Sequence, residues 1–533
     1  MTPLAPPQGV KEQILGWFAP LDARPSTLGA AALLTPVIVL LMLPTSWGWN
    51  EDFYFIQSLL KVAPERAQPY GVAFDTSTAR LLSEWVMGYP VLWFGYDGAH
   101  VLLRLVTALA YGVSLAYCIT GLRLSPLDAL LALSLFVLLG PDIMGGEWLF
   151  AGVEPKTFAY VFVFLGLGSV FRDRATPAAV PFAIATWFHF LVGGFWALAG
   201  FAFVLLQHRA ARPLIRPVAL FAVLSSPVLV LLVVDQYVAG AAAVPAHGLS
   251  ADYIYGIVRS PHHTAPFHDP TLLPEWVDGI VVCLVMIVVL GFLAAQAGPF
   301  ERGFHLWTAA LLGYLLLAVG LSWLDRETSL LGKFFLFRPS SLILIFSILA
   351  LLIAADRWLR GGSSEPGRRR TKAAAGLLVI PLMLWEGSDS KLRDLVLGDP
   401  YSADLAALEA FIEQNTPPDS VIISDPAVGL QRPALSLPRV IDRPMLVTMK
   451  ITPTNPAGIY RWYDLLQFKR EVFAGDCPGP DDPPVRYLIL IDPAAGATAP
   501  CGEIIWRSGH FALAELPSAP GAGRAGDDSA AAR

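Results

Sequence analysis

Long apolar runs alternate with short polar segments along most of the chain. A transmembrane helix needs about 20 mainly apolar residues, and shorter runs suffice where a helix is buried in protein or the bilayer thins. We predict about eleven transmembrane helices, at 27–44, 100–121, 127–140, 157–171, 177–190, 191–207, 217–235, 276–297, 304–323, 336–355 and 373–386. The two helices predicted within 177–207 could alternatively be one tilted helix.

Basic residues mark three of the polar segments between these runs. The three groups are Arg172 with Arg174; His208 with Arg209, Arg212 and Arg216; and the stretch "DRWLRGGSSEPGRRRTK", Asp356–Lys372. Short loops rich in lysine and arginine stay in the cytoplasm. With eleven helices and residues 1–26 inside, all three groups fall on the cytoplasmic side, whereas merging 177–207 breaks this agreement. We therefore predict two helices there. The segments 45–99, 141–156, 236–275 and 324–335 are then outside the cytoplasm.

The composition changes after the last apolar run. "ADLAALEAFIEQNTPPDSVIISDP" predicts an amphipathic helix, a turn and a short strand, and "VRYLILIDP" and "EIIWRSGHFALAEL" predict further strands. We expect a small α/β domain over 387–516, outside the cytoplasm, where Cys477 and Cys501 could form a disulfide. Residues 517–533 are of low complexity and predict a disordered tail. The fold class is thus an α-helical polytopic membrane protein with a small C-terminal α/β domain.

Composition agrees with an integral membrane protein, for which we predict a location in the plasma (inner) membrane. Hydrophobic residues make up 55% of the 533 residues and charged residues 15%, with a mean hydropathy of +0.56, values that soluble domains rarely combine. The net charge of −6 leaves no basic surface for nucleic acid, since the basic residues serve to set orientation. Membrane lipids are the partners that the composition itself predicts.

The first outside segment begins "WGWNEDFYFIQSLLKV". Asn50 is a good helix N-cap, and Glu51 and Asp52 then occupy the first turn. The two acids could simply complement the helix dipole. Alternatively, a carboxylate at the membrane surface could serve as a general base or a metal ligand.

Further ionisable residues lie where the chain re-enters the apolar runs. "GGEWLFAGVEPKTFAYVF" contains Glu147, Glu154 and Lys156. Charges at membrane depth are costly unless they are paired or face water, so they are functional candidates, although Glu154 and Lys156 could also pair with each other. His189 lies at the turn between two short runs, where a satisfied interior histidine is the commoner case.

The stretch "SPHHTAPFHDP", Ser260–Pro270, follows Arg259 and contains His262, His263, His268 and Asp269. Its prolines and irregular spacing disfavour a structural zinc site. Adjacent histidines suit a phosphoryl group, because each ring can donate from one nitrogen while the protein holds the other. An ordinary polar loop is the third possibility.

Arg338 stands just inside the predicted outer interface, in "KFFLFRPSSL". An arginine at this depth matches a lipid-linked phosphate, to which its planar fork can donate two hydrogen bonds. The alternative is that its side chain snorkels to the interface.

The acidic pair after the first run, the long first outside segment, the apolar body and the C-terminal domain together resemble the GT-C superfamily of glycosyltransferases. Within that group the chain is most similar to a family of bacterial multispanning proteins of unknown function, through "RSPHH", "FRPSSL" and "NTPPDSVIISDP" followed by Lys450 and Trp462. The resemblance implies a polyprenyl-phosphate sugar donor, with inverting transfer of a hexosyl or pentosyl group to a cell-envelope acceptor.

Roles follow from that resemblance residue by residue. Asp52, with Glu51 and Glu154 as further acids, is expected to act as base or to bind a divalent cation such as Mg²⁺ or Mn²⁺. Carrier phosphate is expected at Arg338, together with His262, His263, Arg259, Lys156 and His189. The chain lacks a paired Asp-x-Asp and a WWDYG-like motif, which bears on metal dependence and on any protein glycosylation. A transporter or flippase of lipid-linked sugars and a non-catalytic assembly protein remain alternatives.

Overall fold

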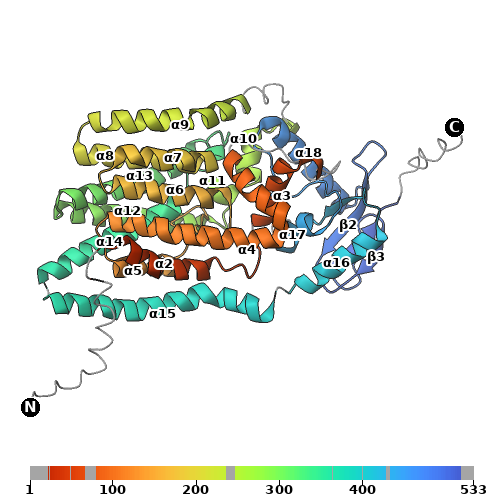
Figure 1. The fold of residues 1–533 in the computed structure, drawn as a ribbon. Helices are drawn as coiled ribbons and strands as arrows, with labels where there is room; N and C mark the ends of the chain where they lie inside the picture. Colours follow the sequence, from red (N-terminus) through yellow and green to blue (C-terminus); the bar gives the residue numbers. More distant parts are fainter. Residues whose placement is uncertain are drawn as a thin grey trace, which may run out of the picture.

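The computed structural model describes residues 22, 25–48, 50–66, 80–235, 246–362, 364–398, 400–427 and 432–517. Within them, the chain forms a bundle of apolar helices and a smaller C-terminal domain that packs against one end of the bundle (Figure 1). Most of the predicted cytoplasmic segment 1–26 and nearly all of the predicted tail 517–533 lie outside the described residues.

Six helices in the described residues are long and apolar enough to cross a membrane. They are α4 (Leu81–Gly121), α8 (Phe190–His208), α9 (Ile215–Val233, continuous with a 3₁₀ turn at Arg212–Leu214), α12 (Leu273–Ala295), α13 (Pro299–Leu324) and α14 (Ser340–Gly362). Four shorter apolar helices pack among them: α2 (Thr27–Leu41), α5 (Pro126–Leu139), α6 (Pro155–Val170) and α7 (Ala175–Phe188). The prediction of a polytopic helical membrane protein is confirmed at this level, whereas the count of about eleven spans stays a prediction.

The last predicted apolar run, 373–386, lies inside a longer helix. Helix α15 extends over Glu365–Leu397 and runs along the bundle beside α5 (Figure 1). It passes the predicted start of the C-terminal domain at residue 387. The first helix of that domain, α16, begins at Ser402.

Helices α7 and α8 form an antiparallel hairpin rather than one tilted helix. Nε2 of His208, at the end of α8, lies 2.8 Å from Oδ1 of Asp173, two residues before α7, so these two ends lie together. Close packing near the opposite turn is possible because Gly193 approaches the backbone of Thr186, where a β-carbon would come within 2.2 Å of its nitrogen.

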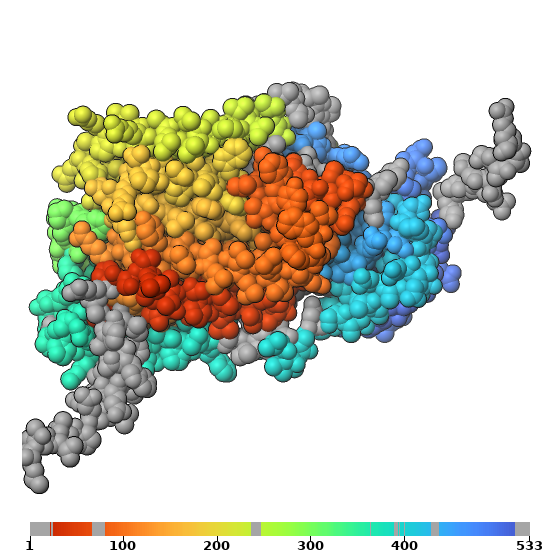
Figure 2. All heavy atoms as spheres, viewed as in Figure 1, coloured from red at the N-terminus to blue at the C-terminus, as the bar shows by residue number. Residues whose placement is uncertain are grey.

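Ion pairs bring the basic segments together at one end of the bundle. Lys372 in α15 reaches Asp22, Asp128 at the start of α5, and Asp356 in α14. Arg172 at the end of α6 donates to Thr120 at the end of α4. We call this the basic end. The C-terminal domain lies at the opposite end (Figures 1 and 2).

The predicted first outside segment forms a helical hairpin at that opposite end. Helix α3 (Glu51–Val62) packs on the first part of α4, where Gly88 lies so close to Ser58 that a β-carbon would meet its carbonyl oxygen at 2.2 Å. Helix α4 bends at Gly95, whose φ of 69° is a left-handed value that glycine tolerates. The bend separates the portion beside α3 from the apolar portion in the bundle.

The C-terminal domain is built on a four-stranded mixed sheet in the order β1-β2-β4-β3. The strands are β1 (Val421–Ser424), β2 (Val485–Ile491), β3 (Glu503–Arg507) and β4 (Phe511–Glu515). Strand β1 runs parallel to β2, and β4 is antiparallel to both of its neighbours. Helices α16 (Ser402–Asn415), α17 (Arg432–Val440) and α18 (Pro456–Ala474) accompany the sheet. The predicted helix, turn and strands are confirmed, whereas α17 and α18 were not predicted.

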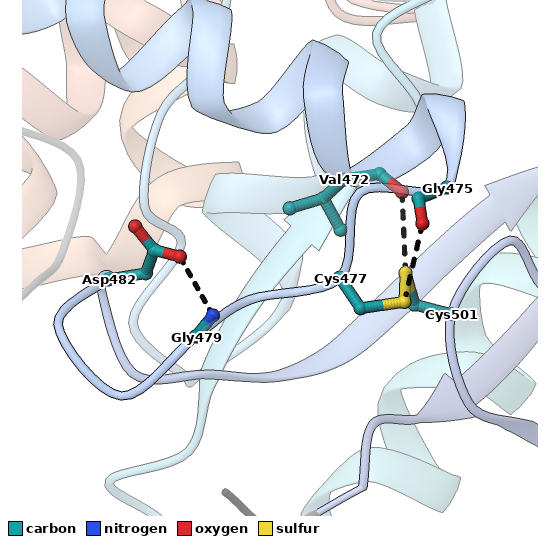
Figure 3. The surroundings of a disulfide bond; sticks show 6 residues. All are labelled: Val472, Gly475, Cys477, Gly479, Asp482 and Cys501. Atoms are coloured by element: carbon teal, nitrogen blue, oxygen red, sulfur yellow. Dashed lines mark hydrogen bonds between the residues drawn. A yellow bond between two sulfur atoms is a disulfide. The ribbon is translucent and has the colours of Figure 1, made fainter.

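Cys477 and Cys501 are joined by a disulfide in this domain (Figure 3). It ties the loop after α18 to the segment before β3. Its environment includes the carbonyl of Val472, 3.7 Å from the Cys501 sulfur. The two cysteines thus form the disulfide that the sequence allowed, whereas the location of the domain outside the cytoplasm stays a prediction.

Candidate functional site

Buried charged side chains gather where the bundle meets the C-terminal domain. Lys156, in the first turn of α6, lies with its Nζ 2.7 Å from Glu147 Oε2 and 3.6 Å from Glu154 Oε2. Arg338, just before α14, places its Nε 3.4 Å from the other oxygen of Glu147. Burial alone would raise the pKa of Glu147, but Lys156 and Arg338 outweigh that effect and hold the pKa at about 2. Glu147 is therefore ionised at neutral pH.

Two of the predicted histidines contact this group. His189, at the turn between α7 and α8, lies with Nε2 2.7 Å from Nη1 of Arg338. His263 belongs to the short helix α11 (Pro261–Thr264), and its Nδ1 lies 2.6 Å from the carbonyl oxygen of Gly145. Burial lowers the pKa of His263 to about 3, so its ring is neutral at pH 7 and Nδ1 donates to that carbonyl. His262 lies against His263, with ring centroids 4.0 Å apart.

More cations border the same region. Arg259 donates from Nε to the hydroxyl of Thr452 in the C-terminal domain at 2.9 Å. Burial and the charge of Arg259 lower the pKa of nearby Lys450 to about 8. The guanidinium of Arg80 lies 5.1 Å from the centre of the Tyr54 ring in α3. Burial raises the pKa of the Tyr54 hydroxyl, and the charges of Glu154, Arg80, Arg338 and Arg259 also act on it.

We refer to these residues as the cation-rich cluster. Its members are Arg80, Glu147, Glu154, Lys156, Arg259, Arg338 and Lys450. The cations outnumber the carboxylates. Buried like charges repel one another strongly at low dielectric, so such an excess favours an anionic ligand.

Two buried polar atoms in this region lack a hydrogen-bond or ion-pair partner among the described residues. They are Oε1 of Glu154 and Nδ1 of His189. Glu154 is only 2% exposed and His189 only 8%. A buried polar atom without a partner costs about 1–3 kcal/mol, and native proteins usually satisfy such atoms unless they serve a ligand or a reaction.

Glu51 is held differently. Its carboxylate accepts from Nε of Arg104 at 2.8 Å and from the backbone N–H of Val153 at 2.6 Å. Burial would raise the pKa of Glu51, but hydrogen bonds from His100 and Arg104 lower it to about 2. Since Val153 directly precedes Glu154, the Glu51–Arg104 pair holds the segment that carries Glu154. The structure thus gives Glu51 the geometry of a positioning residue.

Asp52 faces the C-terminal domain instead of the cation-rich cluster. It forms an ion pair with Arg439 in α17, and the Ser436 hydroxyl lies 3.3 Å from its other oxygen. Arg439 also lies over the Trp47 ring, 4.1 Å from its centre. Burial raises the pKa of Asp52, while Arg439 opposes the shift. The Asn50 side chain makes no hydrogen bond to the first turn of α3, so the predicted N-cap contact is not formed.

Comparison with models of known protein families gave no match. Comparison with curated protein sequences also found no significant similarity. The resemblance to the GT-C superfamily therefore stays a prediction from the sequence.

No group of three or more His, Cys, Asp or Glu side chains among the described residues is arranged to hold a metal ion. Asp52 as a ligand of Mg²⁺ or Mn²⁺ stays a prediction. Asp269, at the end of the histidine stretch, accepts from the hydroxyl of Thr271 at 2.7 Å.

The sequence predicted many of the residues of the site, but several others were not predicted. Arg80, Tyr54, Arg104, His100 and Arg439 were not among the predicted site residues. Arg104 and His100 stand in the apolar run 100–121, where an ionisable residue is itself a sign of a buried partner. Arg439 gave no comparable signal.

Proposed function

We propose that this protein is a membrane glycosyltransferase that takes a sugar from a polyprenyl-phosphate carrier. The observation that carries the proposal is the cation-rich cluster with the unpartnered buried atoms of Glu154 and His189. A carrier phosphate between Arg338, Arg259 and Lys450 would offset the excess positive charge. The disulfide and the basic loops at the opposite end support a site facing away from the cytoplasm.

Each of the three candidate acids has a distinct place in this proposal. Glu154 is the carboxylate within the cluster that has a buried, unpartnered oxygen, so we assign it the role of general base. Glu51 positions Glu154 through the N–H of Val153. Asp52 holds the C-terminal domain through Arg439, and with it Lys450 and Thr452.

The chemistry then follows from charge. The acceptor hydroxyl gives its proton to Glu154 as its oxygen bonds to the anomeric carbon of the sugar. The bond from that carbon to the phosphate oxygen breaks, and the electron pair leaves with the carrier phosphate. Arg338 donates hydrogen bonds to the negative charge that develops there. Attack by the acceptor on the face opposite the leaving phosphate inverts the anomeric centre.

The proposal is tested by separating binding from transfer in the full chain. Binding is measured by equilibrium dialysis of radiolabelled polyprenyl phosphate, and transfer by loss of label from a polyprenyl-phosphate sugar in membranes. Glu154→Gln should bind normally and lose transfer by about a hundredfold, as expected for a general base. Arg338→Gln should weaken binding by about tenfold.

Arg326→Gln is the matched control, because Arg326 is an exposed arginine at the same end that lies over Trp323. It should change neither quantity. Unaltered carrier binding in Arg338→Gln would contradict the proposed carrier-phosphate site. Normal binding by the wild type with no transfer of any carrier-linked sugar would instead support a flippase, and would contradict the assignment of Glu154.

A further inference from the structure

A second polar cavity lies at the basic end, away from the cation-rich cluster. It has a volume of about 460 Å³ and lies between the ends of α4, α6 and α8 and the start of α13. Its polar lining includes Thr120, Arg123, Arg172, Asp173, Gln207 and His208. Phe171, Phe203 and Phe300 supply apolar walls. The volume is in the range of sites for small organic ligands.

Arg172 is fixed in this cavity without a counter-ion among the described residues. Its Nη1 donates to the carbonyl oxygens of Tyr117 at 2.6 Å and Gly168 at 2.7 Å, and its Nη2 donates to the hydroxyl of Thr120 at 2.9 Å. All of these acceptors are uncharged. The guanidinium also lies 3.9 Å from the centre of the Tyr117 ring, so its position is set by the bundle.

Arg123 adds a second cation. Its guanidinium lies 5.2 Å from the centre of the Phe300 ring, and no carboxylate pairs with it in the part of the chain that the structure describes. The backbone of Arg123 has a φ of 66°, a left-handed value that is uncommon for a residue other than glycine. Asp173 is the cavity's carboxylate, and it is paired with His208 at 2.8 Å. The net charge of the lining is therefore positive.

The cavity lies at the ends of helices that are long and apolar enough to cross a membrane. Helices α4 and α8 end at the cavity and α13 begins there. At this depth a lipid head group can enter the cavity while its acyl chains stay in the bilayer. Two arginines without counter-ions match a phosphate diester better than a neutral or cationic head group.

We propose that this cavity binds the phosphate group of an anionic phospholipid. The site is separate from the proposed carrier site and does not depend on glycosyl transfer. Arg172 supplies a fixed positive charge, because its Nη groups already donate within the bundle. Arg123 supplies an exposed guanidinium, and Gln207 supplies a neutral amide. Bound lipid would tie together the termini of four helices, α4, α6, α8 and α13, from different parts of the chain.

Native mass spectrometry of the purified full chain tests this proposal. The protein in detergent is exposed in turn to phosphatidylglycerol and to zwitterionic phosphatidylethanolamine. Wild-type protein should retain phosphatidylglycerol selectively. Arg123→Gln should reduce that retention about tenfold, since a hydrogen bond to a charged group is lost. Arg123 is exposed, so this change should leave the fold intact.

Arg216→Gln is the matched control, because Arg216 is an exposed arginine at the start of α9 that does not line the cavity. It should retain phosphatidylglycerol as the wild type does. Equal loss in both variants, or no loss in Arg123→Gln, would overturn the proposal. Displacement of the lipid by soluble glycerol 3-phosphate would support a phosphate-binding site that also accepts soluble phosphate esters. Resistance to displacement would show that the site requires the phosphate of a lipid.

Discussion

The two ends of the bundle each contain a buried cluster of charges, but the clusters differ in balance. At the basic end, Lys372 lies 3.1, 2.8 and 2.6 Å from Asp22, Asp128 and Asp356, and Arg368 reaches two of the same carboxylates. At the opposite end, the cation-rich cluster has more cations than carboxylates and includes atoms without partners. The charged side chains of the two clusters are buried to a similar extent, so burial alone does not distinguish a structural cluster from a binding cluster.

The difference shows how a structural cluster is told from a binding cluster. A buried charge network is tolerated when each charge faces an opposite one, and the basic-end cluster meets this condition while tying α5, α14 and α15 together. The cation-rich cluster leaves positive charge and hydrogen-bonding capacity unused. Removing a charged residue should therefore lower the stability of the protein at the basic end, and should weaken ligand binding at the cation-rich cluster.

Lys372→Met should produce the largest loss of stability. It leaves three buried carboxylates sharing Arg368 and the more exposed Arg360, and breaking a buried ion pair in this way costs about 3–5 kcal/mol. Thermal unfolding of the purified protein in detergent should show a lower midpoint, with normal polyprenyl-phosphate binding in the protein that remains folded. A midpoint unchanged from wild type would mean that the basic-end cluster is not a stabilising network.

Acidification should act on the cation-rich end through His263. Its folded pKa of about 3 lies below the ordinary value of 6.5, so the unfolded chain takes up a proton that the folded chain does not. The stability due to the neutral ring is present above pH 6.5 and falls as the pH drops towards 3. Between pH 7 and pH 5 this amounts to about 2 kcal/mol.

His263→Asn keeps a donor for Gly145 but does not titrate in this range. The variant should lose about 2 kcal/mol less stability than the wild type between pH 7 and pH 5. Glu147, with a pKa held at about 2, contributes stability above its ordinary pKa of 4.5, and loses it only as the pH falls from there towards 2. Equal acid sensitivity in the variant and the wild type would place the responsible group elsewhere.

The ion pair between Asp52 and Arg439 should have the smallest effect. A double-mutant cycle with Asp52→Asn and Arg439→Gln should give a coupling energy of about 1 kcal/mol in unfolding of the full chain. Asp52→Asn combined with Arg326→Gln should be additive, because these two residues make no contact. Additive behaviour of Asp52 and Arg439 would show that this pair does not hold the two domains together.

Local sequence patterns predicted the elements well and the partners poorly. Hydrophobic runs predicted helices such as α12 and α14, because the apolar residues that mark such a helix all lie within the helix itself. Glu154, Lys156 and Arg338 were predicted as site residues because a charge at membrane depth is costly unless it is paired or serves a function. The partner of Asp52 lies 387 positions away, in a helix that no run of residues predicted, so only the folded chain reveals it.

The disulfide in the C-terminal domain also has a consequence for how the protein is made. Joining two cysteines 24 positions apart removes conformational freedom from the unfolded domain, an effect of about 3 kcal/mol in the chain-entropy model. That contribution becomes available only after oxidation, which under the predicted topology follows translocation. The newly made domain would cross the membrane without this bond and reach its full stability afterwards. Recombinant production should accordingly yield a more stable C-terminal domain in hosts that oxidise exported proteins.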